Sequence, residues 1–168
     1  ADGIRFDLSE EAVVPWGPDS QQNMFYDHRR DKYVAYLRAV RELMGIDANE
    51  WRMVMRCEVD DPDDWSKAEP KIVFRPDADD PPDVDFYTNA CVLYPWAADA
   101  YFMFPAAYHH FPAEYGNDGL LDISAAASRA SGGASGLAWA RSRRNSAAES
   151  LPIRRPSAPN AVARRSGS

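Results

Sequence analysis

Two stretches of the chain repeat one pattern, and this repeat restricts the fold more than any other feature of the sequence. In each stretch an Asp lies four residues before an Asn, and two β-prone segments follow, separated by five residues. The Asp-Asn pairs lie 66 residues apart: Asp19 with Asn23, and Asp85 with Asn89. Two strands joined by a short loop form a β-hairpin. The repeat therefore predicts two equivalent hairpins in a chain of 168 residues, the length of one domain.

The two hairpins also agree in how they continue after the loop. The predicted hairpins are 23–38, with its loop at 27–31, and 89–104, with its loop at 95–99. Tyr33 and Tyr101 take equivalent places behind the loops and lie 68 residues apart, so the second copy is two residues longer before its loop. A repeat of this size, with about four strands, matches a large β-propeller blade.

Alternation of apolar and polar side chains extends beyond the hairpins. Such alternation is typical of strands with one buried face. Segments of this kind, separated by turns rich in Pro and Asp, predict strands at 23–26, 32–38, 53–59, 71–75, 90–94, 100–104 and 120–125. The one helical pattern is short: Val40, Leu43 and Met44, ended by Gly45. The sequence therefore predicts an all-β fold.

The charge of the chain changes sign near residue 125. Residues 1–124 hold 11 Lys and Arg against 25 Asp and Glu, whereas residues 125–168 hold eight Arg against a single acid. The second part is rich in Ala and Ser, with too little apolar bulk to offset the entropy of ordering its backbone. We expect a folded part at 1–124 and a disordered tail at 125–168. Because out-of-frame reading of GC-rich DNA yields such a tail, we also expect a fragment, truncated at its start and shifted in frame near residue 125.

Several classes of protein do not fit this sequence. No apolar run reaches the 18 residues of a membrane-spanning helix, and no signal-peptide pattern is visible. Cys57 and Cys91 are too few for a disulfide scaffold and are expected to be buried thiols. No phosphate-binding Gly-rich loop is present, and the Arg pairs of the tail lack interleaved aromatic residues. We therefore expect no cofactor, no nucleic-acid partner and no membrane insertion.

A second motif lies between the hairpins. Glu58 and Asp60 precede Trp65 by seven and five residues. This spacing resembles the Asp-box of sialidases and other propellers, in which the Asp caps a turn and the Trp packs between sheets. Glu58 stands where the motif has Ser, and Pro62 stands where it has Gly.

The hairpins carry a more extensive resemblance. They read Asp-Ser-Gln-Gln-Asn-Met-Phe-Tyr-Asp with Lys-Tyr-Val-Ala-Tyr-Leu-Arg, and Asp-Phe-Tyr-Thr-Asn with Ala-Tyr-Phe-Met-Phe-Pro. Over about residues 2–129 the chain resembles the five-bladed β-propeller glycoside hydrolases, which include fructan- and arabinan-cleaving enzymes and bacterial relatives. The resemblance implies a partial β-propeller of about two four-stranded antiparallel blades. It also implies a sugar site on the propeller axis, where three acids from successive blades act as nucleophile or base, stabiliser and general acid.

Carried over to this chain, the resemblance names its site residues. Asp19 and Asp85 are the catalytic candidates, because they lie at the starts of the expected innermost strands, and Glu58 is a candidate acid. Asn23 and Asn89 are expected to bind substrate beside them. The alternative for the two Asp residues is to hold a strand turn. The sequence Arg-Cys-Glu around Glu58 does not match the motifs of the fructan-cleaving enzymes, which disfavours that subgroup.

Two further residues are candidates for substrate binding. His109 lies within Tyr-His-His-Phe and could reach a sugar hydroxyl, and Trp96 could stack on a sugar ring, with packing between blades as the alternative. The five acids between Asp77 and Asp85 could form a cation-binding loop, but we expect a solvated acidic loop and no metal.

Two functions remain open for such a chain. The first is a fragment of a carbohydrate-active protein that hydrolyses a glycosidic bond when intact, with this chain alone inactive. The second is a non-catalytic carbohydrate-binding or structural propeller segment. A complete set of converging acids separates the two, because hydrolysis needs two carboxyl groups at a defined separation.

Overall fold

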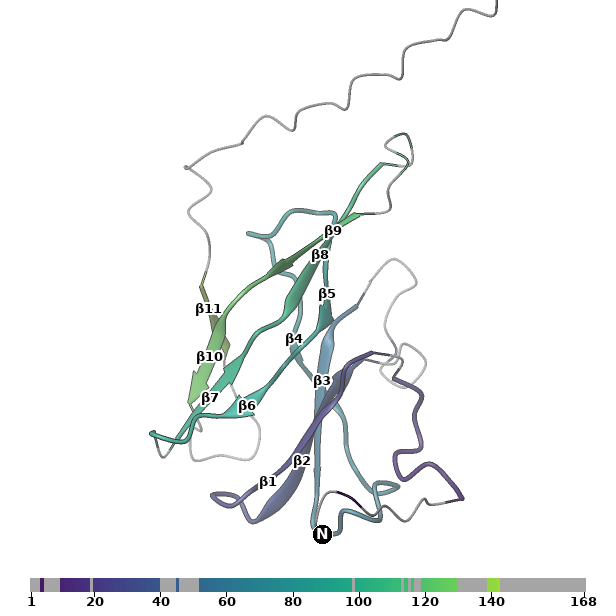
Figure 1. The fold of residues 1–168 in the computed structure, drawn as a ribbon, viewed down its shortest axis with the longest axis vertical. Coiled ribbons are helices and arrows are strands. Elements are labelled where there is room, and N and C mark those ends of the chain that lie inside the picture. The colour runs from purple at the N-terminus through teal and green to yellow at the C-terminus, as the bar shows by residue number, and fades with distance from the viewer. Residues whose placement is uncertain are drawn as a thin grey trace, which may run out of the picture.

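The fold consists of antiparallel strands throughout (Figure 1). The computed structural model describes residues 4, 10–18, 20–39, 45, 52–97, 99–112, 114, 116, 119–129 and 139–142. Within these residues no helix is long and apolar enough to cross a membrane. Asp19 and the helical pattern at 40–44 lie outside the described residues, as do 130–138 and 143–168.

The first four strands form one sheet in sequence order, which we call the first meander. Its strands are β1 (Asn23–Asp27), β2 (Lys32–Arg38), β3 (Val54–Val59) and β4 (Lys71–Phe74). Because successive side chains of a strand point to opposite faces, the continuous burial of the middle of β2 means that both of its faces are covered. The central strands of this meander are therefore packed on two sides.

The remaining strands form two further sheets. They are β5 (Val84–Thr88), β6 (Val92–Leu93), β7 (Ala100–Met103), β8 (Ala106–His110), β9 (Gly119–Ile123), β10 (Ala126–Arg129) and β11 (Trp139–Arg141). Their orders are β5-β8-β9 in the three-stranded sheet and β11-β10-β7-β6 in the four-stranded sheet.

These two sheets continue into one another as a single bent ladder. Two residues separate β7 from β8 and two separate β9 from β10, and Figure 1 shows each pair as one long bent ribbon. Backbone hydrogen bonds bridge the bend, from Phe104 N to Asn89 O and from Ser124 N to Pro105 O, both at 3.0 Å. Pro105 has no N–H and suits a place where regular pairing is interrupted. We call this ladder, from β5 to β11, the second meander.

Two clusters of buried side chains hold the fold together. The first lies between the meanders and combines Val34, Tyr36, Val54 and Phe74 of the first meander with Val84, Phe86, Met103, Ala107 and Ala126 of the second. The second covers the outer face of the first meander, where Leu37, Met55 and Cys57 pack with Trp65. Cys91 is also buried, and both cysteines are free thiols.

The all-β prediction is confirmed for the described residues, and each of the seven predicted segments contains a strand. One loop is shorter than predicted, because Asp27 pairs with Lys32 and leaves four residues, 28–31, between β1 and β2. The second hairpin is two residues longer than the first, and the structure shows where. Its loop, 95–99, is one residue longer than the loop of the first hairpin. The other additional residue lies at Ala90, whose backbone has a positive φ of 44°.

Ordered strands also occur beyond the boundary predicted at residue 124. β10 and β11 lie in the segment whose composition predicts a disordered tail. Packing explains the difference: the small residues Ala126 and Ser128 are buried, and the Trp139 ring meets the Tyr36 ring edge-on at a centroid distance of 6.2 Å. The ordered part of the chain therefore reaches at least Ser142.

Candidate functional site

Asp85 is a fully buried carboxylate with an unusual set of contacts. Its Oδ2 atom accepts a hydrogen bond from Arg52 Nη1 at 2.9 Å and lies 2.9 Å from His110 Nε2. Its Oδ1 atom is buried and has no hydrogen-bond partner among the described residues. Buried carboxylate oxygens are normally bonded, so Oδ1 stands out as an acceptor that no group of the described residues satisfies.

Aromatic rings surround this carboxylate and its arginine. The Arg52 guanidinium lies 4.7 Å from the Tyr87 ring centroid and 5.3 Å from that of Tyr108, which are cation–π distances. The rings of Tyr108 and His110 meet edge to face, with centroids 4.6 Å apart. We call Arg52, Asp85, Tyr87, Tyr108 and His110 the Asp85 cluster. It fixes one carboxylate in one orientation beside flat apolar surfaces.

The strand register explains why these residues meet. Asp85 on β5 is opposite Tyr108 on β8, so both side chains lie on the same face of the second meander. A β-bulge between Phe86 and Thr88 inserts Tyr87 as an additional residue. Arg52 comes from the segment before β3, and its backbone O accepts a hydrogen bond from Phe86 N at 3.0 Å. The cluster therefore joins the two meanders.

Asn89, a predicted substrate contact, is used by the fold. Its side chain is buried, and Nδ2 donates to the carbonyl O of Tyr36 at 3.1 Å and of Gln21 at 3.4 Å. Its Oδ1 accepts from Cys91 N at 3.1 Å. The bulge shifts the strand alternation by one residue, which turns Asn89 toward the first meander while Asp85 points to the opposite face. Asn23, the equivalent residue of the first hairpin, is partly buried and lies on β1.

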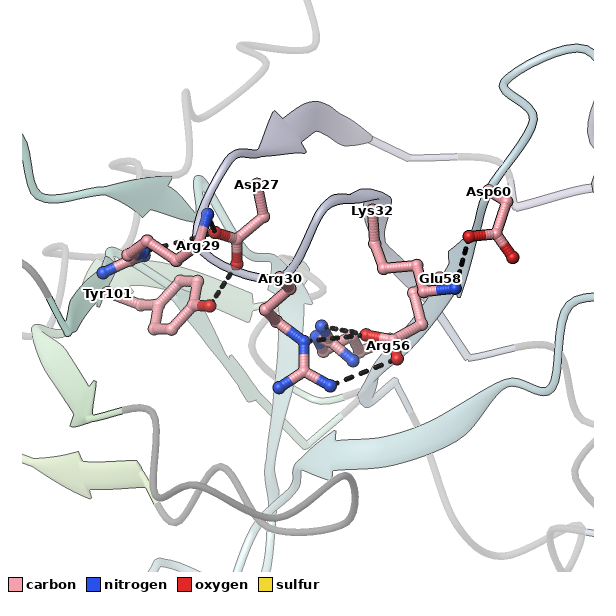
Figure 2. Close-up of polar contacts among 8 residues, drawn as sticks. All are labelled: Asp27, Arg29, Arg30, Lys32, Arg56, Glu58, Asp60 and Tyr101. Carbon is pink, nitrogen blue, oxygen red and sulfur yellow. Dashed lines mark hydrogen bonds and ion pairs between the residues drawn. The ribbon is translucent and has the colours of Figure 1, made fainter.

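Glu58 is held by two arginines in the interface between the meanders (Figure 2). Arg30 donates to both carboxylate oxygens, at 3.1 and 3.2 Å, and Arg56 donates to Oε2 at 2.7 Å. Partial burial raises the pKa of Glu58, but the hydrogen bonds and charges of Arg30 and Arg56 outweigh it, so the pKa lies below its ordinary value. An ionised Glu58 is poorly suited to donate a proton, which disfavours the general-acid role suggested by the sequence.

This lowered pKa predicts a pH dependence of stability. A depressed folded-state pKa stabilises the protein above the unfolded-state pKa, and the contribution is lost as the pH falls through the folded value. We expect Glu58→Gln to lower the free energy of unfolding by about 1 kcal/mol at pH 7, because two arginines lose an ionic partner. The difference from wild type should shrink as the pH falls below about 4. Urea titrations at pH 7, 5 and 3 measure it, and a difference that grows toward low pH would contradict the assignment.

A neighbouring buried carboxylate, Asp27, was not singled out by the sequence. It is fully buried, accepts hydrogen bonds from Tyr101 OH and from Arg29 Nε at 3.2 Å, and lies on β1 (Figure 2). Burial and the hydrogen bond to Asp27 raise the pKa of Tyr101 to about 12. The sequence holds only a weak indication of this buried ion pair, namely an Asp at the end of a predicted strand with two arginines in the turn that follows.

The structure does not gather the other predicted residues around Asp85. His109 points to the face opposite Asp85, because Val84 and not Asp85 is its partner in the register, and it lines a cleft of about 920 Å³ with Asp122 and Arg141. Trp96 is 82% exposed in the turn between β6 and β7, at the other end of the second meander. Asp19 lies outside the described residues.

The Asp-box resemblance and the acidic loop have structural counterparts. Trp65 is buried against the outer face of the first meander, and the turn before it is capped by Asp61, which accepts from Asp63 N at 3.0 Å, while Asp60 pairs with Lys32. In the acidic loop, Asp80 pairs with Arg141 at 2.5 Å. The described residues contain no group of three or more His, Cys, Asp or Glu that could hold a metal ion.

Comparison with known proteins adds no relative. The chain matches no protein-family model, and no significant match was found among curated proteins or solved structures. The functional argument therefore depends on the site itself.

Proposed function

We propose that the two meanders are successive blades of a β-propeller and that the Asp85 cluster is part of a carbohydrate site, at which the intact protein hydrolyses a glycosidic bond. The observation that carries the proposal is Asp85 itself, a buried carboxylate fixed through Oδ2 while Oδ1 has no partner among the described residues.

The way the meanders pack supports the propeller. The first meander contributes the face of β2 that carries Val34 and Tyr36. The second meander contributes the face of β7 that carries Met103. In the repeat, Met103 corresponds to Ala35, which lies on the opposite face of β2 from Val34 and Tyr36. Equivalent units thus meet through different faces, head to tail. Such packing continues from unit to unit, as it does between propeller blades.

The opposite face of the second meander fits the same arrangement. The repeat aligns Phe102 and Phe104 with the packing residues Val34 and Tyr36 of the first meander. This face is apolar and open to solvent, since Phe104 is 44%, Val92 is 45% and Leu121 is 53% exposed. In a propeller a further blade covers this face.

The chemistry of the cluster suits a sugar. A carboxylate oxygen accepts hydrogen bonds from hydroxyl groups, and aromatic rings such as those of Tyr87 and Tyr108 pack against the apolar side of a pyranose or furanose. Because Arg52 and His110 hold Oδ2, Asp85 is assigned the part of base, nucleophile or stabiliser. Hydrolysis also needs a proton-donating carboxyl group. Glu58 is unsuited to that part, so we expect the chain by itself to bind without turnover.

Oligosaccharide binding by the full chain tests the proposal. A panel of arabino-, fructo-, xylo- and cello-oligosaccharides is titrated by calorimetry. We expect binding of at least one series and a loss of about tenfold or more in affinity for Asp85→Asn, which keeps the size of the side chain but removes its charge. Asp83→Asn, an exposed residue two positions earlier, is the matched control and should bind as wild type does. Absence of binding to every series would refute the proposal.

A second cavity favours the non-catalytic alternative. About 670 Å³ in volume, it lies on the outer face of the first meander and is lined by Trp16, Tyr26, Tyr33 and Trp65 among others. Aromatic side chains of this kind can bind a sugar without chemistry. The same titrations decide between the two: binding that survives Asp85→Asn but is lost in Tyr26→Ala assigns carbohydrate binding to this cavity.

A further inference from the structure

The cavity on the outer face of the first meander, which we call the aromatic cavity, has a lining that is largely apolar. The rings of Tyr26 and Tyr33 lie side by side in it, with centroids 5.1 Å apart, and Trp16 and Trp65 complete its aromatic surface. Three polar groups of the lining already donate within the chain: Trp65 Nε1 to Pro62 O at 2.7 Å, Gln22 Nε2 to Pro18 O at 2.9 Å, and Tyr26 OH to Asp31. A ligand therefore has to be largely apolar where it meets these rings.

Acidic side chains without a cationic partner among the described residues border the aromatic cavity. They are exposed, and each is adjacent in sequence to a residue of the lining or bonded to one: Glu11, Asp31, Asp61 and Asp63. The neighbouring cations of the described residues are paired with other acids: Arg29 with Asp27, Arg30 with Glu58, Lys32 with Asp60, and Lys67 with Asp64. This border therefore attracts a cationic ligand.

The negative charge remains when every charged residue of the surrounding segments is counted. All residues of the lining belong to two segments, 1–33 and 56–69. The first holds seven Asp and Glu against four Lys and Arg, and the second holds six against two. By contrast, residues 125–168 hold eight Arg against a single acid. The C-terminal part of the chain is therefore complementary in charge to the segments that form the cavity.

Both properties of the cavity suit an extended peptide that contains proline and arginine. Proline-rich peptides form the polyproline II helix and dock into grooves lined by aromatic rings. Because proline has no N–H, it needs no acceptor from an apolar lining. Arginine pairs with carboxylates through its planar guanidinium. Such a peptide uses both the rings and the charge, whereas a neutral sugar gains no net attraction from the charge.

The chain itself contains such a sequence. Residues 152–159, which lie outside the described residues, read Pro-Ile-Arg-Arg-Pro-Ser-Ala-Pro and include no acid. Pro156 and Pro159 are three residues apart, which is the repeat of a polyproline II helix. The described part of the chain reaches Ser142, and the ten residues from there to Pro152 span about 33 Å when extended.

We propose that residues 152–159 bind in the aromatic cavity of the same chain, with the prolines against the rings and Arg154 and Arg155 at the acidic border. The contact is independent of the proposed sugar site, because no residue of the Asp85 cluster lines this cavity. It makes the cavity self-blocked, so that another ligand enters only when the segment leaves.

Competition by a separate peptide tests this contact. A fluorescein-labelled peptide of residues 150–161 is titrated by anisotropy into the full chain and into the full chain that carries both Arg154→Glu and Arg155→Glu. The double variant should no longer block its own cavity, so we expect it to bind the peptide about tenfold more tightly than wild type does. The control carries Arg164→Glu and Arg165→Glu, the same change outside the segment, and should bind the peptide as wild type does.

Two further changes, each added to the Arg154→Glu and Arg155→Glu chain, locate the bound peptide. Tyr26→Ala removes a ring of the lining that is 46% exposed, and it should weaken the peptide about tenfold. Tyr94→Ala removes a ring of similar exposure, 37%, from the second meander and should leave the affinity unchanged. The proposal is overturned if the peptide does not bind the double variant, if it binds wild type equally well, or if Tyr26→Ala has no effect.

Discussion

Replacing Phe86 with alanine is expected to lower the free energy of unfolding by about 3–5 kcal/mol. Phe86 is 1% exposed, and its ring meets the Phe74 ring of the first meander at a centroid distance of 4.5 Å. The Arg141 guanidinium covers the Phe86 ring at 5.1 Å. The substitution therefore opens a cavity where β4, β5 and β11 meet, and the surrounding strands can collapse into it only in part.

Urea denaturation followed by tryptophan fluorescence measures this loss. Leu120→Ala is the control, because Leu120 on the nearby strand β9 is 55% exposed, and its truncation should change stability by less than about 0.5 kcal/mol. A loss for Phe86→Ala no larger than that of the control would show that the two meanders do not share this core.

The second large effect is expected at Asp27. Removing one partner of a buried ion pair leaves the other charge uncompensated, which costs about 3–5 kcal/mol. Asp27→Ala leaves Arg29, whose side chain is 13% exposed, without its carboxylate, and it removes the acceptor of Tyr101 OH. We place the expected loss near the lower end of this range, at about 3 kcal/mol, because Arg29 keeps some contact with solvent.

A neighbouring carboxylate provides the control for this prediction. Asp31 lies four residues later in the same turn, is exposed, and accepts a hydrogen bond from Tyr26 OH at 2.5 Å. Asp31→Asn should cost less than about 1 kcal/mol, because Tyr26 OH and the residue 31 side chain both remain in contact with water and Asn tolerates the φ of 53° at this position. Combining Asp27→Ala with Tyr101→Phe should cost less than the sum of the two single changes, since they remove the same hydrogen bond. Strict additivity would exclude that bond as a source of stability.

Strands with many residues of high β propensity are easier to predict from the sequence than strands that begin with small residues. β2 and β3 are rich in β-branched, aromatic and sulfur-containing residues, and both were located. β8 and β10 begin with pairs of alanine, which has little β propensity, and they form because small residues fit the interface between the meanders. β11 also depends on a contact that is distant in the sequence: Trp139 has no alternating neighbours, and its ring packs against that of Tyr36.

For the candidate site, the sequence identified the carboxylate but not its partners. Asp85 stood out through the repeat, whereas Arg52 and His110 reach it from 33 and 25 residues away and carry no local signal. Sequence alone does not fix which side chain of the pair His109 and His110 faces Asp85, and it is His110 that makes the contact. The register of β5 with β8 makes that choice.

The bulge between Phe86 and Thr88 makes the length of this strand as important as its composition. One strand serves two faces: Asp85 turns to the cluster, and four residues later Asn89 turns to the carbonyl of Tyr36 in the first meander. Deleting a single residue at 87–88 would restore strict alternation and rotate Asn89 away from that carbonyl. The number of residues in this strand is therefore constrained in addition to their identity.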